Sequence, residues 1–139
     1  MEQNADFLLR EVQRVTNFLS KLIHNICSLN EYNIEDSIKE TDDFIKENWN
    51  FSFQEITTLS DTALLSKLEN IPEIHIEKFV GLLNELLKHS KQTAIKKEYN
   101  WHEIARKGSV ILVELEKNTT VFSLQRNQLK TALEGYRLQ

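Results

Sequence analysis

The four histidines have the most versatile chemistry in this chain, because imidazole can bind a metal ion or transfer a proton near neutral pH. They are His24, His75, His89 and His102. His102 and Glu103 begin like the "HE" of a zinc-protease helix, but no second histidine follows four residues later. The Glu-x-x-His pair of di-iron bundles does not occur. We therefore expect no bound metal, and expect each histidine at the surface or half-buried.

The remaining nucleophiles and acids lack the neighbours that catalysis needs. Cys27 is the only cysteine; no internal disulfide can form, which suits a reducing compartment, and we expect Cys27 to be a small buried hydrophobe. Asp42 and Asp43 lie among lysines and glutamates and are expected to be solvated. Three glycines are too few for a phosphate-binding loop, and no serine lies in a nucleophile elbow. The sequence therefore predicts no enzyme active site and no cofactor.

The distribution of charge argues against nucleic acids and membranes as partners. The formal net charge is −4, and acidic and basic residues are mixed along the chain, whereas nucleic-acid binders show a basic stripe. The one basic cluster, at residues 88–97, resembles a solvated connection. No apolar run reaches the length of about 20 residues that spans a bilayer, and charges interrupt the first helix in a way that excludes a signal peptide. We expect a cytoplasmic protein.

The longest regular pattern lies near the N-terminus and predicts a helix at about residues 5–29. Its apolar residues recur with four-three alternation, which puts them in one seam along the helix. They are Leu8, Val12, Val15, Leu19, Leu22, Ile26 and Leu29. Leu9, Phe18 and Ile23 widen this seam, as in a helix that is buried in a bundle. We favour packing inside the fold, with a dimer interface shared by two chains as the alternative.

The next helix boundaries follow from capping signals. Asn33 can cap a second helix that ends near residues 48–50. Ser52 and Glu55 form a capping box before a short helical turn, and Ser60 can cap a helix that ends near residue 70.

The second half of the chain predicts three further helices. Pro72 is expected at the first position of a helix that is apolar over a wide arc and so forms the centre of the core. Gly81 lies inside this helix, where either a neighbouring helix approaches closely or the glycine is a tolerated chance residue. A capping box at residues 100–103 predicts a helix at 101–117, and the last helix is expected to open at Thr119 or Thr120. The chain is thus expected to be a single all-α domain over residues 1–139, with about six helices: the long N-terminal helix and helical hairpins over residues 33–139.

Trp49 and Trp101 both fall at predicted helix ends, where a large amphipathic ring can be partly exposed. They are candidates for hot spots of a protein interface, with anchoring of the core as the alternative. Together with Leu8, Val12, Val15, Leu19, Leu22 and Ile26 they make up the candidate interface.

The order of elements is similar to that of a family of small uncharacterised bacterial proteins whose C-terminal helices pair like tetratricopeptide repeats. The resemblance rests on residues 51–87 and 105–133, and above all on "TALLSKL" at 62–68 and "FSLQR" at 122–126. It implies tetratricopeptide-like helical hairpins and no particular activity. No 34-residue period accompanies it, so tandem repeats are not expected.

Two functions stay open on the sequence alone. The first is a module for protein–protein interaction or assembly, binding another protein or a second copy of itself, because two helices present broad apolar faces and few other elements could cover them. The second is a small helical-bundle enzyme or ligand carrier with a pocket between its helices.

Overall fold

The computed structural model of the chain describes residues 2–27, 34–90, 99–119 and 123–137. These residues contain seven helices and no strand, which confirms the predicted all-α fold of about six helices. The helices are α1 (Glu2–Cys27), α2 (Ile34–Trp49), α3 (Glu55–Thr58), α4 (Asp61–Leu68), α5 (Glu73–Lys88), α6 (Trp101–Lys117) and α7 (Leu124–Arg137).

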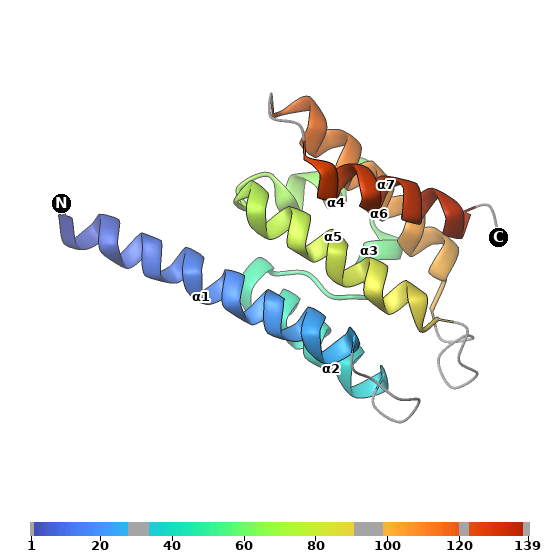
Figure 1. Cartoon of the computed structure of the whole chain (residues 1–139), viewed down its shortest axis with the longest axis horizontal. Coiled ribbons are helices and arrows are strands. Elements are labelled where there is room, and N and C mark those ends of the chain that lie inside the picture. Colours follow the sequence, from blue (N-terminus) through green and yellow to red (C-terminus); the bar gives the residue numbers. More distant parts are fainter. Residues whose placement is uncertain (1, 28–33, 91–98, 120–122, 138–139) are drawn as a thin grey trace.

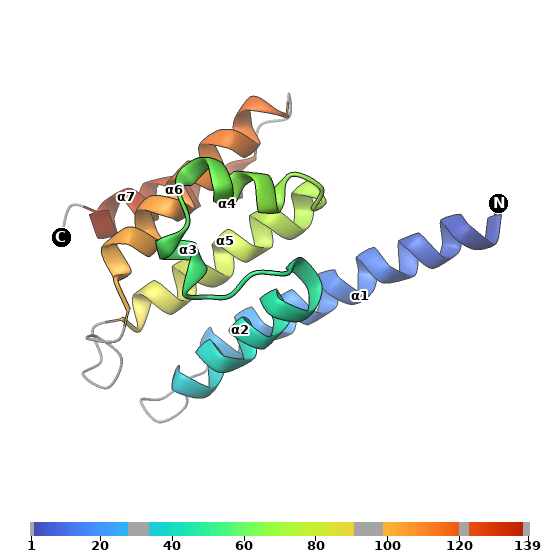
Figure 2. The ribbon, with the colours of Figure 1, turned by 180° about the vertical axis from the view of Figure 1, so that it is seen from behind.

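The helices form two layers, and α5 is the middle helix of the first layer. In Figure 1, α1, α5 and α7 run side by side and in the same direction, and α5 is in the middle; α5 packs against both α1 and α7. Seen from behind in Figure 2, α2, α3, α4 and α6 form the other layer. In that layer, α6 packs against α3 and α4 as well as against α5 and α7, while α2 packs against α1.

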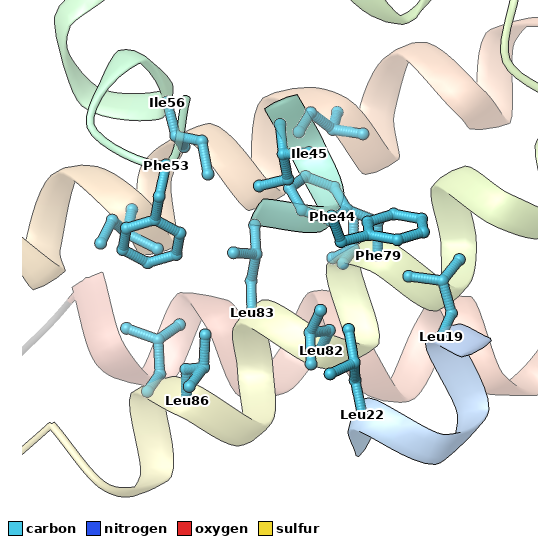
Figure 3. Packing of buried hydrophobic residues seen from close by; sticks show 14 of the residues in the cluster. Leu19, Leu22, Phe44, Ile45, Phe53, Ile56, Phe79, Leu82, Leu83 and Leu86 are labelled. Atoms are coloured by element: carbon cyan, nitrogen blue, oxygen red, sulfur yellow. The ribbon is translucent and has the colours of Figure 1, made fainter. Parts of the chain in front are cut away.

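The core is centred on α5, as the wide apolar arc of its sequence predicts. Its buried apolar residues are Phe79, Val80, Leu82, Leu83, Leu86 and Leu87. Figure 3 shows side chains of α1, α2 and α3 converging on them, among them Leu22, Phe44 and Ile56. Burial of a side chain of this size stabilises a fold by roughly 1.5–3 kcal/mol, so these six residues make α5 a main contributor to the core.

Three of the predicted helix starts are confirmed by the hydrogen bonds they make. The Glu55 amide donates to the Ser52 hydroxyl at 3.2 Å, and the Ser52 amide donates to the Glu55 carboxylate at 3.0 Å, which is the reciprocal bonding of a capping box. The Ala63 amide donates to Ser60 at 3.1 Å, and the Glu103 amide donates to Asn100 at 3.1 Å. Capping needs only residues three apart, which is why the sequence suffices for it.

Two predicted boundaries are wrong by a few residues. Pro72 does not occupy the first position of α5: it has φ −55° and ψ 141°, and its carbonyl accepts from His75 and Ile76, so it is the residue just before the helix. The last helix begins at Leu124, where the Ser123 hydroxyl accepts from the Arg126 amide at 3.2 Å. The predicted cap at Asn33 lies outside the described residues.

Of the two alternatives for Gly81, the structure does not support the close approach of a neighbouring helix and fits a tolerated glycine. A Cβ atom at Gly81 would meet its nearest neighbour, Cδ1 of Ile23, at 4.0 Å, an ordinary contact distance. The close approach occurs instead at Gly108 of α6, where a Cβ atom would lie 3.1 Å from Cδ1 of Leu133 in α7. Packing between α6 and α7 is therefore tight at Gly108, where Leu133 would have to shift by a few tenths of an ångström to admit a Cβ atom, while at Gly81 there is space on the surface of α5.

Candidate functional site

The structure divides the N-terminal seam into two parts. In the second half of α1, Val15, Leu19, Leu22 and Ile26 are buried against the rest of the fold, with exposed fractions between 0% and 9%. In the first half, Leu8 is 62% exposed and Val12 is 36% exposed. The two alternatives drawn from the sequence therefore apply to different residues: the second half belongs to the core, and only Leu8 and Val12 are available to another chain.

The N-terminal part of α1, residues 2–11, is a helical arm, and its residues 6–10 are exposed. It projects beyond the other helices (Figures 1 and 2). Three consecutive apolar residues of the arm, Phe7, Leu8 and Leu9, are 63%, 62% and 67% exposed. Successive residues of a helix point about 100° apart, so these three side chains cover a broad arc that includes the seam direction of Leu8.

The base of the arm is fixed to α5 by His75. Its ring atom Nε2 lies 3.0 Å from the Val12 carbonyl oxygen and 3.0 Å from the Thr16 hydroxyl oxygen. Because a carbonyl oxygen only accepts, Nε2 carries the hydrogen and donates to Val12. His75 is only 3% exposed, so the expectation of a surface or half-buried histidine is wrong here. The histidine therefore orients the arm.

We call the rest of the described fold, from Val12 onward, the body. A concave notch of about 420 Å³ lies where the arm leaves the body. One wall is the arm base, and the other is formed by the end of α2, the end of α4 and the connection from α4 to α5. The residues that line it are Glu11, Val12, Arg14, Val15, Asn48, Trp49, Asn50, Lys67, Asn70, Ile71, Pro72 and His75. Arg14 is bonded to Glu11 at 3.1 Å and to Asn48 at 3.3 Å. Within the described residues Lys67 forms no ion pair, so the notch keeps one uncompensated positive charge.

A groove of about 620 Å³ lies on the opposite side of α1, between α1, α5 and α7. Ile23, Gly81 and Leu129 give it apolar lining, and Lys78 is among its polar residues. Asn84 also lines the groove; it is 6% exposed, and its Oδ1 atom has no hydrogen-bond partner in the structure. A buried amide oxygen without a donor costs about 1–3 kcal/mol, which makes the groove the best candidate for a small-ligand pocket.

Both tryptophans are buried. Trp49 is 9% exposed, and its ring packs edge-on against Phe44 and Phe79 at centroid distances of 5.0 and 5.1 Å. Trp101 is 8% exposed and packs against Tyr99 at 5.6 Å. Of the two readings of the sequence, anchoring of the core describes both side chains, although the edge of Trp49 also reaches the notch.

Cys27 is exposed, so the expectation of a buried cysteine is wrong. It lies at the end of α1, off the seam that packs on the body. Desolvation and the neighbouring Glu85 raise the pKa of its thiol. A raised pKa leaves less thiolate at neutral pH, which makes Cys27 a poor nucleophile.

One polar cluster, which joins Asp61 to Arg106 and Lys107, was not predicted from the sequence. The Lys107 side chain is 1% exposed; its ammonium donates to the Leu59 carbonyl and lies 3.1 Å from Asp61. Arg106 donates to both Asp61 carboxylate oxygens at 2.8 and 3.0 Å. Hydrogen bonds from Arg106 and Lys107 hold the pKa of Asp61 well below its usual range. The cluster joins α4 to α6 and contains no unpaired acid or base, which points to a structural role.

Within the described ranges, no three histidine, cysteine, aspartate or glutamate side chains gather in a way that could hold a metal ion. The same part of the chain has no helix long and apolar enough to cross a membrane. Comparisons with protein-family models, with curated proteins and with solved structures find no match for this chain.

Proposed function

We propose that this protein is an assembly module that binds another protein chain through the arm and the notch. The observation that carries the proposal is the exposure of Phe7, Leu8 and Leu9 on a helix whose continuation is core. Single exposed apolar residues are common on protein surfaces, whereas a contiguous apolar patch marks an interaction site. The cytoplasm is the compartment that we propose for it.

The energetics support a partner for the arm. Each square ångström of apolar surface removed from water contributes about 25 cal/mol. An aromatic side chain such as Phe7 can bury about 150 Å² of its surface. Together the three side chains of the arm offer several kcal/mol to any chain that covers them. The notch next to them adds a concave wall with polar groups, which is the usual composition of a specific interface.

The helical pairing of α5 with α6 and of α6 with α7 supports a second, structural part of the proposal, that these helices form hairpins of the tetratricopeptide type. Such hairpins present grooves to protein ligands, so this architecture and a binding function are compatible. An experimental structure of this chain would test the likeness, by superposition of its α5, α6 and α7 on the helices of a tetratricopeptide repeat.

Site-specific photo-crosslinking tests the proposed function. A photo-reactive residue is placed at Leu8 in the arm and, as a matched control, at Asn17, which is exposed on the opposite side of the same helix. In cells that express the chain, we expect a crosslink to a protein chain from position 8 and none from position 17. Crosslinks of equal yield from both positions, or none from position 8, would contradict a binding role of the arm.

A ligand-carrier function is the second candidate, because the groove has a volume of about 620 Å³ and is lined by apolar and polar side chains, Asn84 among them. The test is a thermal-shift screen of metal ions and common metabolites, repeated with Asn84→Leu. A ligand present at one hundred times its Kd adds about 2.7 kcal/mol. A shift that is lost in Asn84→Leu would favour this function over the first.

A further inference from the structure

We infer that the partner of the arm is the arm of a second copy of this chain, inserted antiparallel into the notch, so that Leu8 of each copy lies beside Val12 of the other. The inference rests on the proposed function, since it names the partner of the same surface. In a twofold contact, residue i meets residue j and residue j meets residue i. Each copy therefore supplies one arm and one notch.

The apolar row of the arm is suited to pairing with itself. Leu8 and Val12 continue the row of Val15 and Leu19 toward the N-terminus, and Ala5 occupies the next position of the same alternation in the sequence. No charged residue falls on this row. Twofold pairing therefore brings no like charges face to face, which would otherwise oppose self-association.

The size of the arm explains why the notch is needed. A stable interface commonly uses roughly 20–30 residues from each side, whereas the arm of residues 2–11 is about 15 Å of helix. Contact between two arms alone would be small. The notch adds a second wall from α2, α4 and the α4–α5 connection, including Ile71 and Pro72. An inserted arm is covered on two sides.

Steric exclusion sets the direction of the pair. Val15 and Leu19 use the seam to pack on the body, so the body lies on the side to which Leu8 points. If the second arm ran parallel to the first along Leu8 and Val12, the body of the second copy would lie at the same height along the helix as the body of the first copy, and the two bodies would clash. An antiparallel helix enters the notch with the N-terminal part of its arm and keeps the two bodies at opposite ends of the arm pair.

Charge complementarity agrees with this direction. Asp6 lies two residues before Leu8 and so on the opposite face of the helix. When Leu8 faces the neighbouring arm, Asp6 of the inserted arm faces the α4–α5 wall of the notch, where Lys67 lies. Within the described residues neither Asp6 nor Lys67 forms an ion pair in the single chain. The twofold contact forms this pair twice.

The first experiment measures solution mass by light scattering over a concentration series. We expect a reversible dimer of the full chain, and Leu8→Glu to raise its dissociation constant by about one hundredfold or more, because each twofold contact buries two new carboxylates. A monomer at every concentration would overturn the inference. Such a monomer that still crosslinks from position 8 to a different protein would leave the proposed function standing.

Charge reversal tests the partner surface. Asp6→Lys and Lys67→Asp are each expected to weaken the dimer about tenfold, because two attractive pairs become repulsive. The double variant is expected to recover to within about threefold of the original chain. Asp43→Lys, an exposed reversal on α2 outside the notch, is the control and should change nothing. Additive weakening in the double variant would overturn the assignment of the notch.

Disulfide trapping tests the direction. In a Cys27→Ser background, Leu8→Cys and Val12→Cys chains are mixed and oxidised. The antiparallel pair predicts a mixed disulfide between the two variants, since bridging needs Cβ atoms about 3.5–4.5 Å apart. Leu8→Cys or Val12→Cys alone should bridge poorly. Efficient bridging of each variant with itself would indicate a parallel pair and overturn the inference.

Discussion

Asp61 shows how one residue ties stability to pH. Hydrogen bonds from Arg106, then from Lys107, lower its pKa, and Arg106 also lowers the pKa of Glu103. A carboxyl group whose folded pKa lies below its unfolded pKa adds stability above the unfolded value, about 4, and this stability is lost as pH falls through the folded value. We expect the free energy of unfolding to decrease steadily below about pH 5.

Urea titrations from pH 7 to pH 2 measure this dependence, and Asp61→Asn is the matched variant. It should be less stable than the original chain at pH 7 and should show a shallower decrease on acidification. Equal slopes for the two proteins would contradict a role of Asp61 in the acid response. Lys107 and Leu59 are 48 residues apart, so no local sequence signal could have predicted this cluster.

The two helical glycines give opposite predictions at the residue scale. Gly81→Ala should stabilise the fold by up to about 1 kcal/mol, because alanine is the better helix former and the new Cβ meets nothing closer than 4.0 Å. Gly108→Ala should destabilise it by about 1–2 kcal/mol, since its Cβ would lie 3.1 Å from Leu133 and overpacking outweighs the helix propensity. Urea unfolding of both variants checks the signs; the same sign for both would contradict this packing.

At the scale of elements, α1 is one helix with two environments. Leu19→Glu should unfold the chain or cost more than about 4 kcal/mol, because Leu19 is 0% exposed and the substitution buries a carboxylate. Leu8→Glu should change the stability of the monomer by less than about 0.5 kcal/mol, because Leu8 is 62% exposed. Circular dichroism during urea unfolding of dilute samples measures both. A large loss with Leu8→Glu would show that the arm packs on its own body.

The division of α1 marks the limit of what the sequence could predict. The four-three alternation runs unchanged from Leu8 to Ile26. Its periodicity therefore contains no sign that the burial of α1 by the other helices ends near Val12. That point depends on where α5 begins, and α5 meets α1 through His75, which is 63 residues from Val12. The starts of α3, α4 and α6 were predicted well, because Ser52, Ser60 and Asn100 bond within three residues. The positions of the elements relative to one another were not.

At the scale of the whole molecule, the arm is an addition to a body that has its own core. The buried cluster includes Val15 of α1 and apolar residues from every other helix, but none of residues 6–14, the earlier part of α1 for which burial is described. The sequence indicated a candidate interface that included Leu19, Leu22 and Ile26. The structure restricts that surface to Leu8, Val12 and their exposed neighbours, because the other seam residues have partners within the chain.

Removal of the arm should therefore separate folding from assembly. A chain that begins at residue 10 keeps Val12, Thr16 and the His75 contact, so we expect its free energy of unfolding to lie within about 1 kcal/mol of that of the full chain with Leu8→Glu. Light scattering should find it monomeric at concentrations where the full chain associates. If the shortened chain unfolded, the arm would belong to the folding unit; if it still associated, the interface would lie elsewhere, with the groove around Asn84 as the next surface to mutate.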